Sequence, residues 1–159
     1  MNETGPPNEE TIAEFQKALM ISPFHRWLGL KAIMVAREQI EISLPWREEF
    51  VANTAIEATH GGILAALIDL TGLYAVRAAG GIVSATADLR VDYHRPATRG
   101  TVLARGMVVK LGRRISTADV RVTDTSRVLL AHISHNEACT VVWPIATHHS
   151  SVAQMPNRR

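Results

Sequence analysis

Hydrophobic and polar positions follow two different periods along the chain. From Ile63 to Val76 the residues are ILAALIDLTGLYAV, and Asp69 is the only charged one. A run of this kind predicts a helix from about Gly61 to Ala79, because Gly80-Gly81 follows and glycine commonly ends helices. A helix that is apolar on all sides belongs in a protein core.

Shorter elements precede this helix. Thr11 to Trp27 has the spacing of an amphipathic helix, which Pro23 interrupts. Residues 30–35 and 40–44 read as strands, the second with a strict alternation of apolar and polar positions. Residues 45–59 show no period, and we expect them to be irregular.

Strands alone follow the long helix. We expect four of them, joined by short turns, at residues 84–94, 101–111, 115–123 and 128–143. Short turns join antiparallel neighbours, and a helix without a polar face needs a sheet curled about it. The pattern therefore predicts one α+β domain over residues 11–143, with a curved antiparallel sheet around the helix. We expect a disordered leader over residues 1–10 and a mobile tail over 144–159.

Composition narrows the class of protein. The chain has 159 residues, 47% of them hydrophobic, which suits one globular domain. The first ten residues, MNETGPPNEE, lack the features of a signal peptide, and no stretch of about 20 apolar residues is free of charge. Cys139 is the only cysteine, so no internal disulfide can form. We expect a cytoplasmic protein that does not bind membranes.

The charge pattern argues against a nucleic-acid partner. The formal net charge is +2, and fourteen of the seventeen cations are arginines. Arginine suits contact with phosphates and carboxylates, although such a bias also arises from genome composition. The cations form no run and no aromatic-basic cluster, which argues against a nucleic-acid partner. No cysteine or aspartate frames the histidines, so we expect no metal site at His132, His135, His148 or His149.

Asp69 and the start of its helix carry the candidate chemistry. A buried carboxylate is costly unless it is paired, so Asp69 is either a structural partner of a buried donor or a reactive group. His60-Gly61-Gly62 opens the helix with free backbone N–H groups. His60 lies nine residues before Asp69, on the opposite side of the helix and about 13 Å away along its axis. If both ends serve one reaction, a second subunit must bring its helix start to Asp69.

Four segments, in this order, resemble a known family over roughly residues 23–143. They are the opening at residues 23–29, with Pro23-Phe24 and Leu28-Gly29, the run NTAIEATHGGILAALID at 53–69, the run TADLRVDYHRPATRG at 86–100, and Gly112-Arg113. The chain resembles the hotdog-fold acyl-CoA thioesterases of the PaaI-like, or 4-hydroxybenzoyl-CoA thioesterase-type, family. The resemblance implies a hotdog fold in a homodimer or homotetramer with shared active sites.

The resemblance also implies a mechanism for hydrolysis of an acyl- or aryl-CoA to free acid and CoA. Asp69 attacks the thioester carbonyl or activates a water, and the Gly61 N–H of the other subunit holds the thioester oxygen. The absence of side chains at Gly61 and Gly62 lets the acyl group approach the backbone closely. A thiol with a pKa of about 8.5 is a good leaving group, so we expect no cofactor beyond the CoA of the substrate. The alternative is a hotdog protein that binds acyl-CoA without hydrolysing it.

The resemblance also implies roles for further residues, each with an alternative that the sequence leaves open. His60 shapes the oxyanion hole or serves only as a structural helix start. Either Asn53 or Thr54 contacts the thioester oxygen or the water. Thr86 orients the water or is an ordinary surface threonine. The candidates for the CoA phosphates are Arg90, Arg95, Arg99, Arg113 and Arg114.

Overall fold

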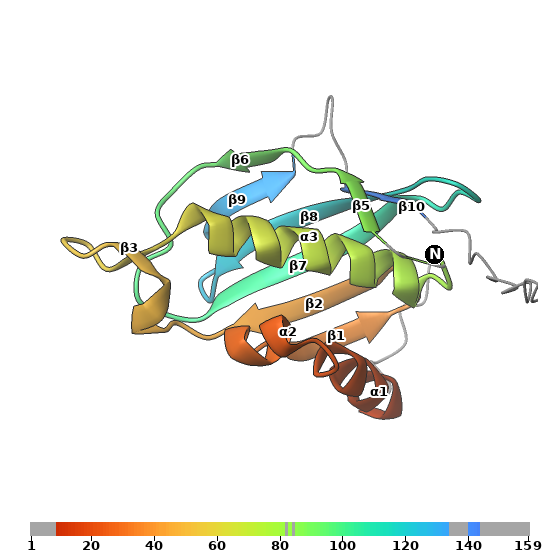
Figure 1. Ribbon diagram of the computed structural model, residues 1–159, viewed down its shortest axis with the longest axis horizontal. Helices are drawn as coiled ribbons and strands as arrows, with labels where there is room; N and C mark the ends of the chain where they lie inside the picture. The colour runs from red at the N-terminus through yellow and green to blue at the C-terminus, as the bar shows by residue number, and fades with distance from the viewer. Residues whose placement is uncertain (1–8, 82, 84, 134–139, 144–159) are drawn as a thin grey trace, which may run out of the picture.

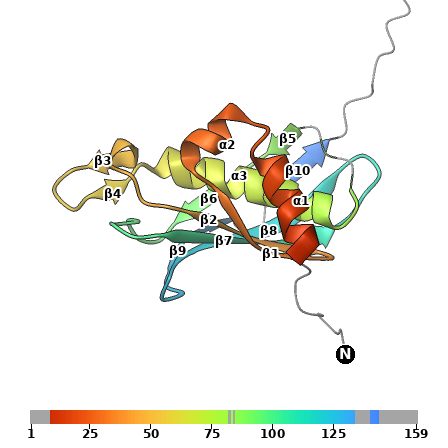
Figure 2. The same ribbon diagram turned by 90° about the horizontal axis from the view of Figure 1, so that it is seen from below.

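An antiparallel sheet of eight strands carries the long helix α3 on one face (Figures 1 and 2). The computed structural model describes residues 9–81, 83, 85–133 and 140–143. The strand order is β1-β2-β7-β8-β10-β5, and β9 lies between β8 and β6. The strands are β1 Lys31–Ala36, β2 Gln39–Leu44, β5 Ala85–Asp88, β6 Val91–Tyr93, β7 Val102–Lys110, β8 Ser116–Asp124, β9 Leu129–Ile133 and β10 Thr140–Trp143.

Helix α3, Gly61–Ala78, forms the centre of the core. Its buried side chains include Leu64, Leu67 and Ile68, and they pack on the inward residues of β2, β7 and β8. In strand β2, Ile40 and Ile42 are fully buried as the alternation predicts, but Glu41 and Ser43 between them are buried as well, so the strand is not half-exposed. The predicted α+β architecture, a curved antiparallel sheet around a central helix, is confirmed.

Two short helices lie beside β1, at the lower edge of the sheet in Figure 1. They are α1, Glu9–Leu19, and α2, Pro23–Leu28, so the predicted interruption at Pro23 is confirmed. The Tyr74 hydroxyl of α3 donates to the Ala18 carbonyl at 3.1 Å and ties α1 to the central helix. Burial raises the pKa of Tyr74, and the smaller effect of the Arg77 charge lowers it. The raised pKa keeps the phenol a neutral donor. Residues 1–8 and 144–159, the greater part of the expected leader and the whole expected tail, lie outside the described residues.

The alternating run at 84–94 is two strands rather than one. Strand β5 pairs with β10, whereas β6 pairs with β9. Thr86 and Val91 are an odd number of residues apart, yet Thr86 contacts α3 and Val91 packs on the core. An unbroken strand would place them on opposite faces, so the break between Asp88 and Val91 reverses the alternation. The prediction of one continuous strand over residues 84–94 was therefore wrong.

The predicted final strand is also divided. Strands β9 and β10 lie along different parts of β8, and residues 134–139 between them lie outside the described residues. In the region expected to be irregular, a single turn of 3-10 helix at Glu48–Phe50 leads into a small hairpin of β3, Val51–Asn53, and β4, Ala58–Thr59. This hairpin ends directly at the start of α3.

One side of α3 is only partly covered by its own chain. Gly62 is exposed, and Ala66, Asp69 and Leu73 are half-buried; their spacings of four, three and four residues place them on one helix face. The helix is therefore not enclosed on all sides, which differs from the expectation drawn from its uniform apolar sequence. The sheet covers one face of α3 and leaves an apolar strip with a single carboxylate.

Length and composition alone would let α3 cross a membrane. In the fold, however, half of it is buried and it packs along the sheet, as the core helix of a globular domain does. Asp69 also lies at its centre, where a charge is costly in a bilayer. Helix α3 is a core helix of this domain.

Candidate active site

Asp69 projects from the middle of α3 toward the edge strand β5. The Thr86 hydroxyl donates a hydrogen bond to its Oδ1 atom. No described residue donates to the other oxygen, Oδ2, and the side chain is only half-buried. Asp69 thus has one fixed oxygen and one that a water or substrate can reach.

The start of α3 is fixed by backbone hydrogen bonds on both sides. The His60 N–H donates to the Phe50 carbonyl at 2.7 Å, and the neighbouring Thr59 N–H donates to the Ala97 carbonyl at 2.8 Å. The His60 imidazole caps the helix, because its Nδ1 accepts from the Gly62 N–H at 2.9 Å. The Gly61 N–H has no acceptor among the described residues.

This arrangement distinguishes the two glycines. The Gly62 N–H is used by the cap, so the Gly61 N–H is the donor that remains for a ligand. The positive end of the helix dipole lies at the same place. An oxygen that gains negative charge is stabilised by such a donor.

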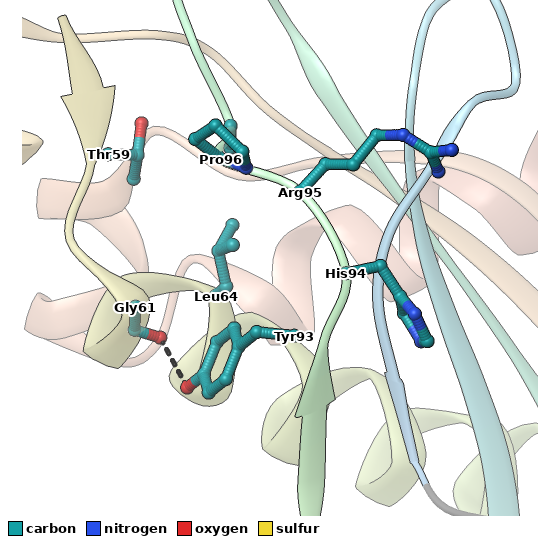
Figure 3. Close-up of a pocket in the computed structure, with 8 residues that line it drawn as sticks. Thr59, Gly61, Leu64, Tyr93, His94, Arg95 and Pro96 are labelled. Atoms are coloured by element: carbon teal, nitrogen blue, oxygen red, sulfur yellow. Dashed lines mark hydrogen bonds between the residues drawn. The ribbon is translucent and has the colours of Figure 1, made fainter. Parts of the chain in front are cut away.

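A pocket of about 290 Å³ opens beside Gly61 (Figure 3). Tyr93, at the end of β6, lies along it and donates from its hydroxyl to the Gly61 carbonyl at 2.9 Å. The other lining residues are Thr59, Leu64, His94, Arg95, Pro96 and Ala97. The exposed surface of the pocket is more apolar than polar, and Gly61 at the helix start is part of its lining.

Asp69 and Gly61 do not meet within one chain. They lie eight residues apart on the same straight helix, a rise of about 12 Å. A thioester carbonyl is far too small to contact both. The single subunit therefore presents two half-sites, one at Asp69 with Thr86 and one at Gly61 with Tyr93.

The polar residues expected before the helix lie in the β3–β4 hairpin. Asn53 and Thr54 are both exposed, and the Asn53 Oδ1 accepts from the Ala55 N–H at 3.0 Å, a local turn that uses its side chain. The structure does not bring either residue to Asp69 or Gly61 of the same chain through any hydrogen bond. The choice between them as a thioester contact stays a prediction.

The candidate phosphate-binding arginines fall into different surroundings. Arg99 is paired with Glu57 at 2.9 Å and lies over the Trp46 ring, and Arg95 donates to the Leu129 carbonyl at 3.2 Å. Figure 3 shows the Arg95 side chain directed away from Gly61. Arg90 lies 3.9 Å from Asp92, whereas Arg113 and Arg114 are exposed in the β7–β8 turn. Arg113 and Arg114 are thus the two with the fewest competing contacts.

Histidines do not gather into a metal centre in the part of the chain that the structure describes, where no three histidine, cysteine, aspartate or glutamate side chains could hold an ion. His94 and His132 do contact each other, with 2.8 Å between Nε2 and Nδ1. His135, Cys139, His148 and His149 lie outside the described residues.

Sequence reasoning missed two features of the site. It assigned no role to Tyr93, and it did not foresee the contact of His94 with His132. The two contacts join residues that are 32 and 38 positions apart in the sequence, so neither spacing nor alternation could indicate them. The one usable signal was that an aromatic residue ends the strand that follows the helix.

The fold and the two half-sites define a hotdog-type domain, and comparisons with known proteins agree. Residues 57–131 match the family model of the thioesterase superfamily. The crystal structure of a protein from the thioesterase superfamily is 40% identical, with a TM-score of 0.73, and the match covers 78% of this chain and 94% of that one. The chain belongs to the thioesterase superfamily and is a thioester hydrolase.

Two further relatives have more specific names. A variant of the phenylacetic acid degradation protein PaaI from Thermus thermophilus is 30% identical, with a TM-score of 0.65, over 78% of this chain and all of that one. The medium/long-chain acyl-CoA thioesterase YigI from Escherichia coli is 26% identical over 69% of this chain and 80% of that one. The predicted resemblance to PaaI-like hotdog thioesterases is confirmed.

Replacing Thr86 with valine tests the Asp69 half-site. Valine has nearly the same shape but cannot donate to the carboxylate, so Asp69 loses its orientation. A hydrogen bond to a charged group contributes about 1.5–3 kcal/mol, so we expect kcat to fall by about 10- to 100-fold. Steady-state kinetics with thermal unfolding as a control measures this. A kcat equal to that of the wild type would make Thr86 an ordinary structural threonine.

Proposed function

We propose that the protein hydrolyses acyl-CoA or aryl-CoA thioesters as a homo-oligomer whose active sites are shared between subunits. Asp69 of one subunit faces the Gly61 N–H of the other, with the thioester carbonyl between them. The observation that carries this proposal is the separation of the two half-sites on one helix, each with a polar atom that has no partner within the described part of the chain. The strip of α3 around Asp69 that its own chain leaves uncovered supports a second subunit at that place.

The chemistry needs few groups. Water adds to the thioester carbonyl, the C–S bond breaks, and the products are a carboxylate, the CoA thiol and a proton. Asp69 either removes a proton from the attacking water or attacks first and forms an anhydride that water then cleaves. The Gly61 N–H stabilises the oxyanion in both routes, and Thr86 holds the carboxylate. The remaining Asp69 oxygen, Oδ2, is the atom available for either role.

We propose coenzyme A as the thiol part of the substrate because of the names of two relatives and the exposed arginines. The name of YigI specifies medium/long-chain acyl-CoA, and that of PaaI specifies phenylacetic acid degradation. The exposed Arg113 and Arg114 suit the CoA phosphates, with Arg90 and Arg95 as further candidates. We propose that no metal or other cofactor takes part, that the protein acts in the cytoplasm, and that it binds neither nucleic acid nor membranes.

A substrate panel tests the function. The panel contains short, medium and long acyl-CoAs, phenylacetyl-CoA, benzoyl-CoA and the acyl-pantetheine analogues that lack the nucleotide. We expect release of free thiol, measured with a thiol reagent, at a kcat of about 1–10³ s⁻¹ for the preferred chain. Binding of acyl-CoA without thiol release would contradict the proposal, and turnover of acyl-pantetheine as fast as acyl-CoA would contradict the role of the arginines.

A further inference from the structure

The peptide group between Gly61 and Gly62 is held at both of its ends. Its carbonyl oxygen accepts a hydrogen bond from the Tyr93 hydroxyl at 2.9 Å. Its N–H, that of Gly62, donates to the His60 Nδ1 atom at 2.9 Å. The C=O and N–H of a trans peptide point in opposite directions, so the two bonds hold one rigid plane from both sides. Rotation of this plane would break at least one of them.

The preceding peptide group, between His60 and Gly61, is held at one end only. Its carbonyl accepts from the Ile63 N–H at 2.9 Å, and its N–H, that of Gly61, is the free donor of the half-site. Gly61 therefore joins two fixed planes, although glycine is the residue with the greatest backbone freedom. The direction of its N–H depends on how firmly both planes are held.

We propose that Tyr93 is a positioning residue for the Gly61 N–H. Its hydroxyl fixes the Gly61 carbonyl and thereby the direction in which the preceding N–H points. This inference rests on the proposed function, because the direction matters only if that N–H receives the thioester oxygen. Oxyanion donors act well when they need no reorganisation at the moment of reaction.

The position of Tyr93 suits this role. Strand β6 holds it through its pairing with β9, where Tyr93 lies opposite Ala131. A Cβ atom at Gly61 would lie 3.3 Å from the Tyr93 ring, so the ring is already in contact with the glycine backbone. Figure 3 shows the phenol oxygen directed at the Gly61 carbonyl from the side of the pocket. The ring thus lies against the helix start, and its hydroxyl holds the Gly61 carbonyl.

Replacing Tyr93 with phenylalanine removes the hydroxyl and keeps the ring. The matched control is Tyr74→Phe, because Tyr74 is the other of the chain's two tyrosines and also donates to a backbone carbonyl, away from the half-sites. We expect Tyr93→Phe to lower kcat by about tenfold, the effect of one neutral hydrogen bond, with little change in KM. Tyr74→Phe should leave kcat unchanged, even where it lowers the unfolding temperature as much.

A second measurement does not depend on activity. In protein labelled with 15N at glycine, the Gly61 amide should show a lower order parameter or exchange broadening in Tyr93→Phe, but not in Tyr74→Phe. An unchanged Gly61 amide, an unchanged kcat, or a loss confined to KM would each overturn the inference. Failure of the wild type to hydrolyse any thioester of the panel would instead refute the proposed function.

Discussion

Asp69→Asn is expected to lower kcat by about 10²–10⁴-fold, the contribution of a positioned general base or nucleophile. Asparagine has the same shape but can neither remove a proton from water nor form an anhydride. The fold should be preserved, because the Thr86 hydroxyl can still donate to the side-chain oxygen and the substitution removes the only charge from the apolar run of the helix at residues 63–76. Kinetics with the preferred thioester, together with circular dichroism and thermal unfolding, measures both effects.

The matched control is Asp124→Asn. Asp124 lies at the end of β8 and its Oδ1 accepts from the Val128 N–H at 2.9 Å, a bond that asparagine can also accept. This variant should keep the kcat of the wild type. Full activity of Asp69→Asn in a folded protein would remove Asp69 from the mechanism and leave it as a structural partner of Thr86.

Gly61→Pro is expected to lower kcat by about 10²–10³-fold, the usual effect of losing one oxyanion donor. Proline lacks the backbone N–H, and Gly61 occupies the first position of α3, where proline is well tolerated. His60 has φ −59° and ψ 133°, a conformation that suits the residue before a proline. The substitution therefore removes the Gly61 N–H, which has no acceptor among the residues that the structure describes, with little expected change in the helix.

The variant Gly61→Ala distinguishes the effect of losing the N–H donor from the effect of crowding beside the Tyr93 ring. Alanine keeps the N–H, while its Cβ would lie 3.3 Å from the Tyr93 ring, as close as a proline Cβ. We expect Gly61→Ala to retain far more activity than Gly61→Pro. Equal losses in the two variants would show that the space beside Tyr93, rather than the N–H, is what the reaction requires.

The central helix could be predicted because its signal is local. The apolar run ends at a glycine pair, and the structure places α3 at Gly61–Ala78, within one residue of the expectation. Asp69 stands out for the same reason, since it is the single charge in that run. The separation of Asp69 from the helix start follows from helix geometry alone, so the two half-sites were also accessible from the sequence.

The strands after the helix were harder to predict, because an alternation of apolar and polar residues shows neither which strands pair nor where a strand is interrupted. The run 84–94 alternates without interruption in sequence, yet its two halves pair with different strands. Thr86 faces Asp69 only because the alternation reverses between those halves. Such a reversal depends on register against β9 and β10, which are more than thirty-five residues away in the chain.

The contact between Tyr93 and Gly61 could not be predicted from the sequence for a similar reason. It spans 32 residues and depends on where β6 ends relative to the start of α3. The capping bond of His60 is local, so a histidine before a glycine pair could have indicated it. The sequence supplied the chemical groups, and the sheet register decided which of them meet.

The shared active site is tested most directly by mixing the two inactive variants. Subunits that carry Asp69→Asn and subunits that carry Gly61→Pro are co-expressed with different tags, and the mixed oligomers are purified through both. In a symmetric dimer each mixed pair contains one site with an intact Asp69 from one subunit and an intact Gly61 from the other. An unselected equal mixture should regain about a quarter of wild-type activity, and the purified mixed dimers about half. Mixed oligomers that assemble but stay as inactive as either parent would contradict the account, because a site contained within one chain cannot be restored by its partner.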